Sequence, residues 1–193
     1  MAVAWEINII TEEAISPEVL NLIIKEYNNY VNVETTISMD DWGGSIKRRL
    51  DSIAEITEEL DKGKIITIEM QSKRWKALGM FAEKEGGVYL YTFWINTEGF
   101  PELDVDKITD ANKKYYNQVY RILDRLIKEF NFSFNYIAIG LESDVRCCAD
   151  IRTAMSNSNN VVVWFIKKSS SMVLPEKLKK QKVSEELDVI VAE

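Results

Sequence analysis

Two apolar strands with a long amphipathic helix between them dominate the pattern of hydrophobic and polar positions. Residues 88–95 and 136–141 are apolar on both pleat faces, which is typical of central strands that are covered on both sides. From about residue 107 to 130, apolar side chains recur every three or four positions and form one broad stripe. This pattern predicts a parallel strand–helix–strand unit with a right-handed crossover.

The N-terminal third of the chain shows one strand and two helices. Apolar and polar residues alternate over 5–9, which predicts a strand with one buried face. The Ser-Pro pair at 16–17 is a typical helix start with serine as the N-cap. Ser45 is expected to cap a second helix that ends at Gly63. Residues 32–44 have no helical period, so we expect an exposed loop or a short strand there.

Further strands follow in quick succession. The apolar runs at 64–70, 75–82 and 88–95 have short connections, which predict an antiparallel meander. After the strand that ends at residue 141, we expect a short helix over 145–155. The most apolar strand of the chain then covers 161–166.

We expect one domain and a short arm. Residues 1–168 hold all the strong strand and helix patterns and predict a single domain. Residues 169–193 predict a lysine-rich C-terminal arm, with a helix begun at Pro175 and a last strand at 188–192.

Composition and charge narrow the class of protein. The chain has 193 residues, 46% of them hydrophobic, which suffices for one well-buried domain. Its net charge of -7 argues against general nucleic-acid binding. No apolar run approaches the roughly 18 residues of a membrane helix, and the N-terminus lacks the pattern of a signal peptide. We therefore expect a cytoplasmic protein without a membrane partner.

Two features of the composition limit the chemistry. The sequence contains no histidine, which excludes Ser-His-Asp triads, Cys-His pairs and histidine-ligated metals. The two cysteines, Cys147 and Cys148, are adjacent, a spacing that rarely forms a disulfide and offers too few ligands for zinc. We expect reduced cysteines and no metal site.

The order of the predicted elements resembles that of the GNAT superfamily of acyl-CoA-dependent N-acyltransferases. Residues 63–66 and 77–81 resemble the family's paired strands, and residues 88–97 resemble the fourth strand, which opens a slot for the pantetheine arm. Residues 135–141, with the short helix after them, resemble the elements that flank this slot. The resemblance implies an α+β fold, with a GNAT-like mixed sheet of six to seven strands and helices on both faces.

The resemblance also implies an activity. It suggests an acyl-CoA-dependent N-acyltransferase that uses acetyl-CoA or another acyl-CoA and acts on a small-molecule or protein amine. Glu98, at the open end of the fourth strand, would be the base for the amine, and Ser143 or Cys148 would be the acid near the leaving thiol. The residues expected to contact the cofactor follow the fourth strand or end it: Ile95, Thr97, Gly99 and Phe100.

A second interpretation treats the chain as a binding protein. The loop over 97–106 keeps one glycine and carries four carboxylates, which would repel the phosphates of CoA. Asp40, Asp41 and Trp42 place an acidic pair beside an aromatic ring, which suits a cationic amine or a basic protein. The alternative is therefore a non-catalytic GNAT-like protein that acts as an inhibitor or immunity protein against a basic toxin or enzyme.

Overall fold

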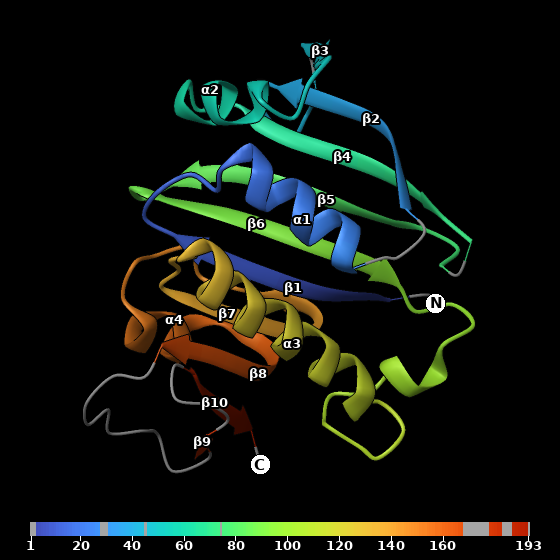
Figure 1. The fold of residues 1–193 in the computed structure, drawn as a ribbon, viewed down its shortest axis with the longest axis vertical. Coiled ribbons are helices and arrows are strands. Elements are labelled where there is room, and N and C mark those ends of the chain that lie inside the picture. The colour runs from blue at the N-terminus through green and yellow to red at the C-terminus, as the bar shows by residue number, and fades with distance from the viewer. Residues whose placement is uncertain are drawn as a thin grey trace.

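The computed structural model describes residues 3–27, 31–44, 46–73, 75–167, 178–182 and 187–192. Within these ranges the chain forms one sheet of ten strands, in the order β3-β2-β4-β5-β6-β1-β7-β8-β10-β9 (Figure 1). The strands are β1 Ala4–Thr11, β2 Val31–Met39, β3 Lys47–Arg49, β4 Ile65–Ser72, β5 Leu78–Glu85, β6 Val88–Asn96, β7 Tyr136–Asp144, β8 Asn159–Lys167, β9 Leu178–Lys182 and β10 Leu187–Ala192. The helices are α1 Pro17–Tyr27, α2 Glu55–Asp61, α3 Lys113–Phe130 and α4 Ile151–Asn157, with a 3-10 turn over Pro101–Leu103.

The predicted fold class, an α+β fold with a GNAT-like mixed sheet of six to seven strands, is wrong, although helices do lie on both faces of the sheet as expected. The described sheet has ten strands, and each neighbouring pair is antiparallel. The difference arises at the centre, where β1 lies between β6 and β7. Ile7 of β1 pairs with Phe93 on one side and with Ile139 on the other. Local periodicity cannot show this insertion, because it depends on pairing between distant segments.

Three predicted boundaries also need correction. Residues 31–39, expected as a loop or short strand, form the nine-residue strand β2. The second helix shortens to α2, and β3 occupies Lys47–Arg49 in its place. Ser45, its predicted cap, lies outside the described residues, as does Pro175. The long helix begins at Lys113, because the Asn112 side chain accepts from the Thr109 N–H at 2.7 Å and donates to the Lys107 carbonyl at 2.9 Å, which holds a turn there.

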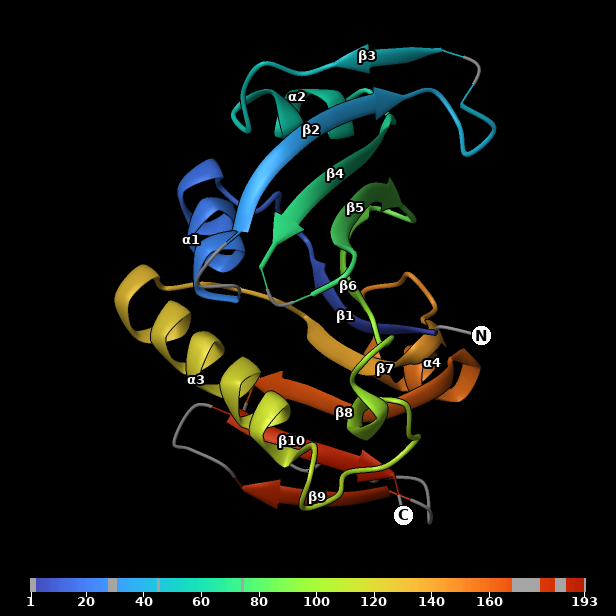
Figure 2. The ribbon, with the colours of Figure 1, turned by 90° about the vertical axis from the view of Figure 1, so that its right-hand side faces the viewer.

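The main core lies between the sheet and the helices α1, α2 and α3. Figure 2 shows α1 and α3 on one side of the central strands. Trp5, Ile7 and Ile9 of β1 point to this side and are at most 4% exposed. The predicted N-cap of α1 is confirmed, since the Ser16 hydroxyl accepts from the Val19 N–H at 3.3 Å. This capping fixes the direction in which α1 leaves β1.

A smaller core covers part of the second face of the sheet. Here α4 packs its buried Ala154 near Tyr136 of β7 and Trp164 of β8. Figure 2 places α4 on the opposite side of the sheet from α1 and α3. Asp150 caps α4, because its carboxylate accepts from the Thr153 N–H at 3.0 Å. The second face near β5 and β6 lies beyond α4, and Phe81 of β5 packs at the border of this smaller core.

Candidate functional site

Glu98, the predicted base, lies on an exposed turn just after β6. Its carboxylate pairs with Lys76 Nζ at 2.5 Å, and its side chain is 53% exposed. Its backbone N–H donates to Asn96 Oδ1 at 2.8 Å, which explains how the turn is held. An exposed carboxylate with a cationic partner is an ordinary surface ion pair.

Ser143, a predicted acid, belongs to a hydrogen-bonded network on the second face of the sheet. Its backbone N–H and hydroxyl both donate to Glu6 Oε2, at 2.8 and 2.9 Å. Asn8 Nδ2 donates to the Ser143 hydroxyl at 2.8 Å, and the Thr92 hydroxyl donates to Asn8 Oδ1 at 2.7 Å. Burial raises the pKa of the Glu6 carboxyl, with a smaller contribution from the charge of Glu142, while the Ser143 hydrogen bonds oppose the shift. The sequence analysis missed Glu6, Asn8 and Thr92 as site residues.

Cys148, the other predicted acid, lies at the opposite end of β6 from Glu98. The neighbouring Cys147 Sγ contacts the Glu85 carbonyl at 3.8 Å, beside the turn that begins β6. Glu98 follows the end of the same nine-residue strand, which spans roughly 30 Å. The Cys148 thiol itself contacts the Asp150 carbonyl at 3.3 Å. Glu98 and Cys148 therefore do not share one site.

The predicted cofactor residues take part in packing and loop contacts. Ile95 is 2% exposed in the main core, and the Thr97 hydroxyl donates to the Val3 carbonyl at 3.1 Å. Phe100 lies against Trp75 with ring centroids 4.1 Å apart. Gly99 adopts a left-handed φ of 87°, as a turn glycine does.

The loop after β6 does not fit the pyrophosphate of CoA. A phosphate loop needs free backbone N–H groups that point at the ligand. Here the N–H groups of Phe100, Leu103 and Asp104 donate to carbonyls of the same loop, at 2.8, 2.9 and 3.2 Å. The Glu102 carboxyl adds negative charge, and its pKa is lowered by a backbone hydrogen bond and by Tyr115.

The predicted partner residues Asp40, Asp41 and Trp42 lie together on the turn that follows β2. Asp40 pairs with Lys64, and Asp41 accepts from the Gly44 N–H at 2.9 Å. Trp42 is 57% exposed. The turn is ordered by its own hydrogen bonds, so it holds the indole in a defined position.

Trp42 is anchored on the second face of the sheet. Its ring stands edge-on to Phe81 of β5 with centroids 5.1 Å apart, and its Nε1 donates to Glu83 Oε2 at 3.3 Å. Burial raises the pKa of the Glu83 carboxyl, and the charge of Glu85 adds to the effect, while the bond from Trp42 opposes it. Contact with β5, which β4 separates from β2 in the sheet, therefore holds the exposed indole beside a carboxylate.

The surface around Trp42 continues across the central strands. Trp94 of β6 stands over Gly79, where an added Cβ would lie 2.7 Å from the indole, and it pairs across the strands with Glu6 of β1. Phe81 lies two positions along β5 from Gly79, on the same face. We call the following five residues the Trp42 face: Glu6, Trp42, Phe81, Glu83 and Trp94. No lysine or arginine in the described ranges pairs with Glu6 or Glu83.

Other kinds of site find no counterpart in the parts of the chain that the structure describes. No group of three or more Cys, Asp or Glu side chains there could hold a metal ion. No helix there is both long and apolar enough to cross a membrane. Comparison with models of protein families gives no match, and comparison with curated proteins gives no significant match.

Proposed function

We propose that the chain is a binding protein that recognises a basic protein partner through the Trp42 face, as an inhibitor or immunity protein against a basic toxin or enzyme would. The observation that carries this proposal is the state of Trp42, which is 57% exposed and yet fixed by Phe81 and Glu83. Large exposed aromatic side chains are enriched among the residues that dominate binding energy. A side chain that is already held loses less freedom on binding.

The charges of the Trp42 face favour a cationic partner. Glu6 and Glu83 are partly buried, and burial raises the pKa of each carboxyl. Neither pairs with a lysine or arginine of the described ranges. A lysine or arginine from a partner would supply that charge beside the faces of Trp42 and Trp94, where cations bind favourably. The net charge of -7 would also speed the approach of a basic protein.

The activity of an acyl-CoA-dependent N-acyltransferase stays a prediction. Glu98 and Cys148 lie at opposite ends of β6, and the N–H groups of Phe100, Leu103 and Asp104 donate to carbonyls of their own loop. These positions give the acetyl-CoA reaction no support, and the GNAT-like sheet that suggested it is not the one described. A binding role requires neither a phosphate-binding loop after β6 nor a shared site for Glu98, Ser143 and Cys148.

The proposal is tested by capturing partners from the native host with the immobilised full chain and two matched variants. Asp41→Lys with Trp42→Ala alters the Trp42 region, and Asp110→Lys with Ile108→Ala replaces an acid by lysine and an exposed apolar residue by alanine at another place. We expect a basic protein to be retained by the wild type and by the control. Its affinity for the Trp42 variant should fall by about 2 kcal/mol, or roughly thirtyfold in Kd. Equal affinity for both variants would overturn the proposal.

A further inference from the structure

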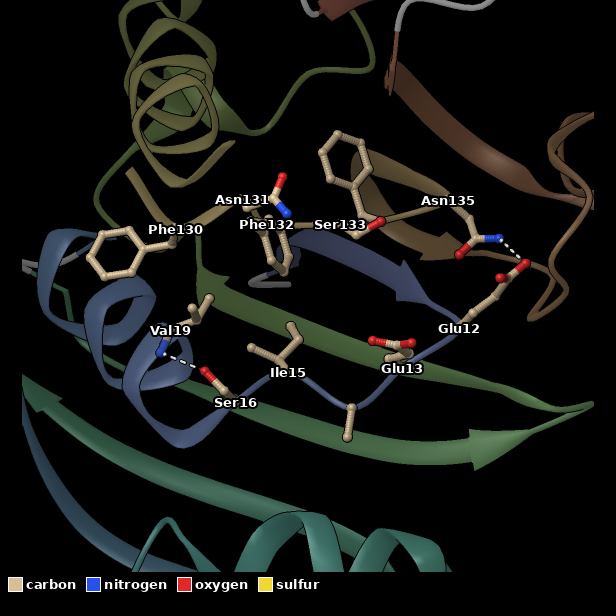
Figure 3. A pocket seen from close by; sticks show the side chains of 12 residues that line it. Glu12, Glu13, Ile15, Ser16, Val19, Phe130, Asn131, Phe132, Ser133 and Asn135 are labelled. Atoms are coloured by element: carbon tan, nitrogen blue, oxygen red, sulfur yellow. Dashed lines mark hydrogen bonds between the residues drawn. The ribbon is translucent and has the colours of Figure 1, made fainter. Parts of the chain in front are cut away.

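A cavity of about 460 Å³ opens where β1 leads into α1 and where α3 turns into β7 (Figure 3). One wall consists of residues 12–16 with Val19, and the other consists of residues 130–135. Val19 belongs to the core on the side of α1 and α3, whereas Phe81 beneath Trp42 belongs to the cluster on the second face. The cavity is therefore a separate place from the Trp42 face, and an inference about it does not rest on the proposed function.

The inner part of the cavity is apolar. Ile15, Val19 and Phe132 contribute side chains that are 4%, 8% and 7% exposed. Phe130, at the end of α3, is 41% exposed and is among the few large apolar side chains that the described residues leave in solvent. Figure 3 shows these four side chains gathered between α1 and the segment that follows α3. A ligand that covered the Phe130 ring would gain about 25 cal/mol for each Å² of apolar surface removed from water.

The rim of the cavity is acidic. Glu12 and Glu13 are both exposed, and Glu12 accepts from Asn135 Nδ2 at 3.2 Å, as Figure 3 shows. Neither carboxylate has a lysine or arginine partner in the described ranges. Two carboxylates beside an apolar wall would attract a molecule with a positive head and an apolar body.

One cation of the chain already contacts the same segment. Lys167 Nζ donates to the Ser133 hydroxyl at 3.2 Å and lies 5.9 Å from the centre of the Phe134 ring. The segment that lines the cavity therefore accommodates an ammonium group against an aromatic ring and a hydroxyl. This is the geometry in which cations and aromatic rings attract one another.

We propose that this cavity binds a small arylalkyl ammonium ion. Its ammonium group pairs with the carboxylates of Glu12 and Glu13, and its apolar body lies on the wall formed by Ile15 and Phe132, which Figure 3 places next to them. The volume of about 460 Å³ falls within the range of roughly 300 to 1,000 Å³ that is usual for small-molecule sites. The same chemistry could come from a lysine side chain of another protein, and the experiment separates the two sources.

The test is an NMR titration of the full chain with 2-phenylethylammonium, followed by backbone amide shifts. 2-Phenylethanol, which has the same ring and chain but no charge, is titrated in parallel. We expect saturable shifts confined to residues 12–19 and 130–135, and an affinity on the order of tenfold above that of the alcohol. Equal affinity for the two compounds, or shifts spread over the whole surface, would overturn the proposal.

Substitutions of the two rim glutamates test whether their carboxylates bind the ammonium group. Glu12→Gln together with Glu13→Gln keeps the shape of the rim and should weaken binding of the ammonium ion by about tenfold while leaving the alcohol unaffected. Glu18→Gln is the matched control, because Glu18 is an exposed acid of the first turn of α1 that does not line the cavity. Loss of affinity in the control alone would contradict the assignment. Nα-Acetyllysine amide mimics a lysine side chain of another protein. If it binds more tightly than 2-phenylethylammonium, a small arylalkyl ammonium ion is not the ligand.

Discussion

At the scale of single residues, polar side chains on the second face of the sheet are buried and satisfied. Asn8 is 3% exposed and Thr92 is 0% exposed, and each finds a partner in the network that ends at Glu6. A buried amide without such partners would cost about 1 to 3 kcal/mol. The network therefore keeps a polar patch in the middle of an otherwise apolar sheet.

The sequence indicated some of these residues and missed others for a physical reason. The alternation over residues 5–9 correctly put Glu6 and Asn8 on one face, which was expected to be polar. It gave no sign that Ser143, 135 positions along the chain from Asn8, would cover them. The acidic pair beside Trp42 could be found from the sequence alone, because Asp40, Asp41 and Trp42 are consecutive. The contact between Trp42 and Phe81 could not be predicted from the sequence, since it joins segments that are distant along the chain.

Gly140 of β7 lies at a bulge where the backbones of β7 and β8 come close together. The pairing between β7 and β8 shifts after Ile139, and a Cβ at residue 140 would lie 1.9 Å from the Asn160 carbonyl oxygen. Gly140→Ala should lower the free energy of unfolding by about 3 kcal/mol or more, because a backbone segment must move. Urea unfolding measures this change.

Gly63 supplies the matched control for the glycine experiment. Its φ is 76°, and nothing lies within 4 Å of an added Cβ, so Gly63→Ala carries only the strain of a left-handed residue. We expect a loss of about 1 to 2 kcal/mol. Equal losses for the two glycines would show that the close approach at Gly140 does not limit the fold.

At the scale of elements, most strands and helices follow the local pattern and a few depend on distant contacts. The strands β4, β5 and β6 and the helix α3 lie where apolar periodicity indicated them. The strand β2 was predicted only as a loop or short strand, because polar residues such as Thr36 and Ser38 are buried there by α2 and its neighbours. A local pattern shows which side chains are apolar, and it cannot show which polar ones a distant helix will cover.

Glu59 of α2 links this helix to the sheet by a hydrogen bond and ion pairs, in addition to the apolar contacts of Ile56 and Leu60. Its carboxylate, 7% exposed, accepts from the Ser38 hydroxyl at 2.7 Å and pairs with Arg48 at 3.1 Å and Lys62 at 3.0 Å. These contacts, the Ser38 hydrogen bond first, lower the pKa of Glu59 below its ordinary 4.5. Glu59→Gln should reduce the free energy of unfolding at pH 7 by about 1 to 3 kcal/mol.

The lowered pKa of Glu59 predicts how its contribution to the free energy of unfolding changes with pH. A carboxyl whose pKa is lowered in the folded state stabilises it above the ordinary pKa, and that contribution is lost as the pH falls through the lowered value. The difference between wild type and Glu59→Gln should therefore shrink when urea unfolding is repeated well below pH 4.5. Glu58→Gln, at a side chain that is 71% exposed, is the control and should change stability by less than about 0.5 kcal/mol. A difference that stayed constant with pH would contradict the role of the charge.

At the scale of the whole molecule, β1 lies between the two halves of the sheet, and basic strands form its two edges. The strand β1 joins the half that begins with β3 to the half that ends with β9 (Figure 2). The edge strand β3 has the sequence KRR, and the edge strand β9 has the sequence LKKQK. Charged residues on an edge, lysines above all, discourage pairing with another chain. The sheet therefore ends at both edges in strands that repel a second copy.

Neutral edges should promote self-association. Lys47→Val with Arg49→Val removes two exposed charges from β3 while leaving Arg48 to its partners on α2. We expect the variant to form dimers or larger species at concentrations where the wild type sediments as one smaller species. Lys107→Val with Arg121→Val removes two exposed charges away from the edges and serves as the control. Unchanged sedimentation of the β3 variant would show that these charges do not protect the edge.

The most direct test of a basic partner at the Trp42 face is site-specific photo-crosslinking in the native host. A photoreactive phenylalanine derivative replaces Glu85, an exposed residue two positions from Glu83 on the same face, in one strain and Ile108, the apolar side chain that is 36% exposed, in another. We predict an adduct with one basic protein from position 85 and no such adduct from position 108. No adduct at position 85, or the same adducts at both positions, would contradict the assignment of this face as the binding surface.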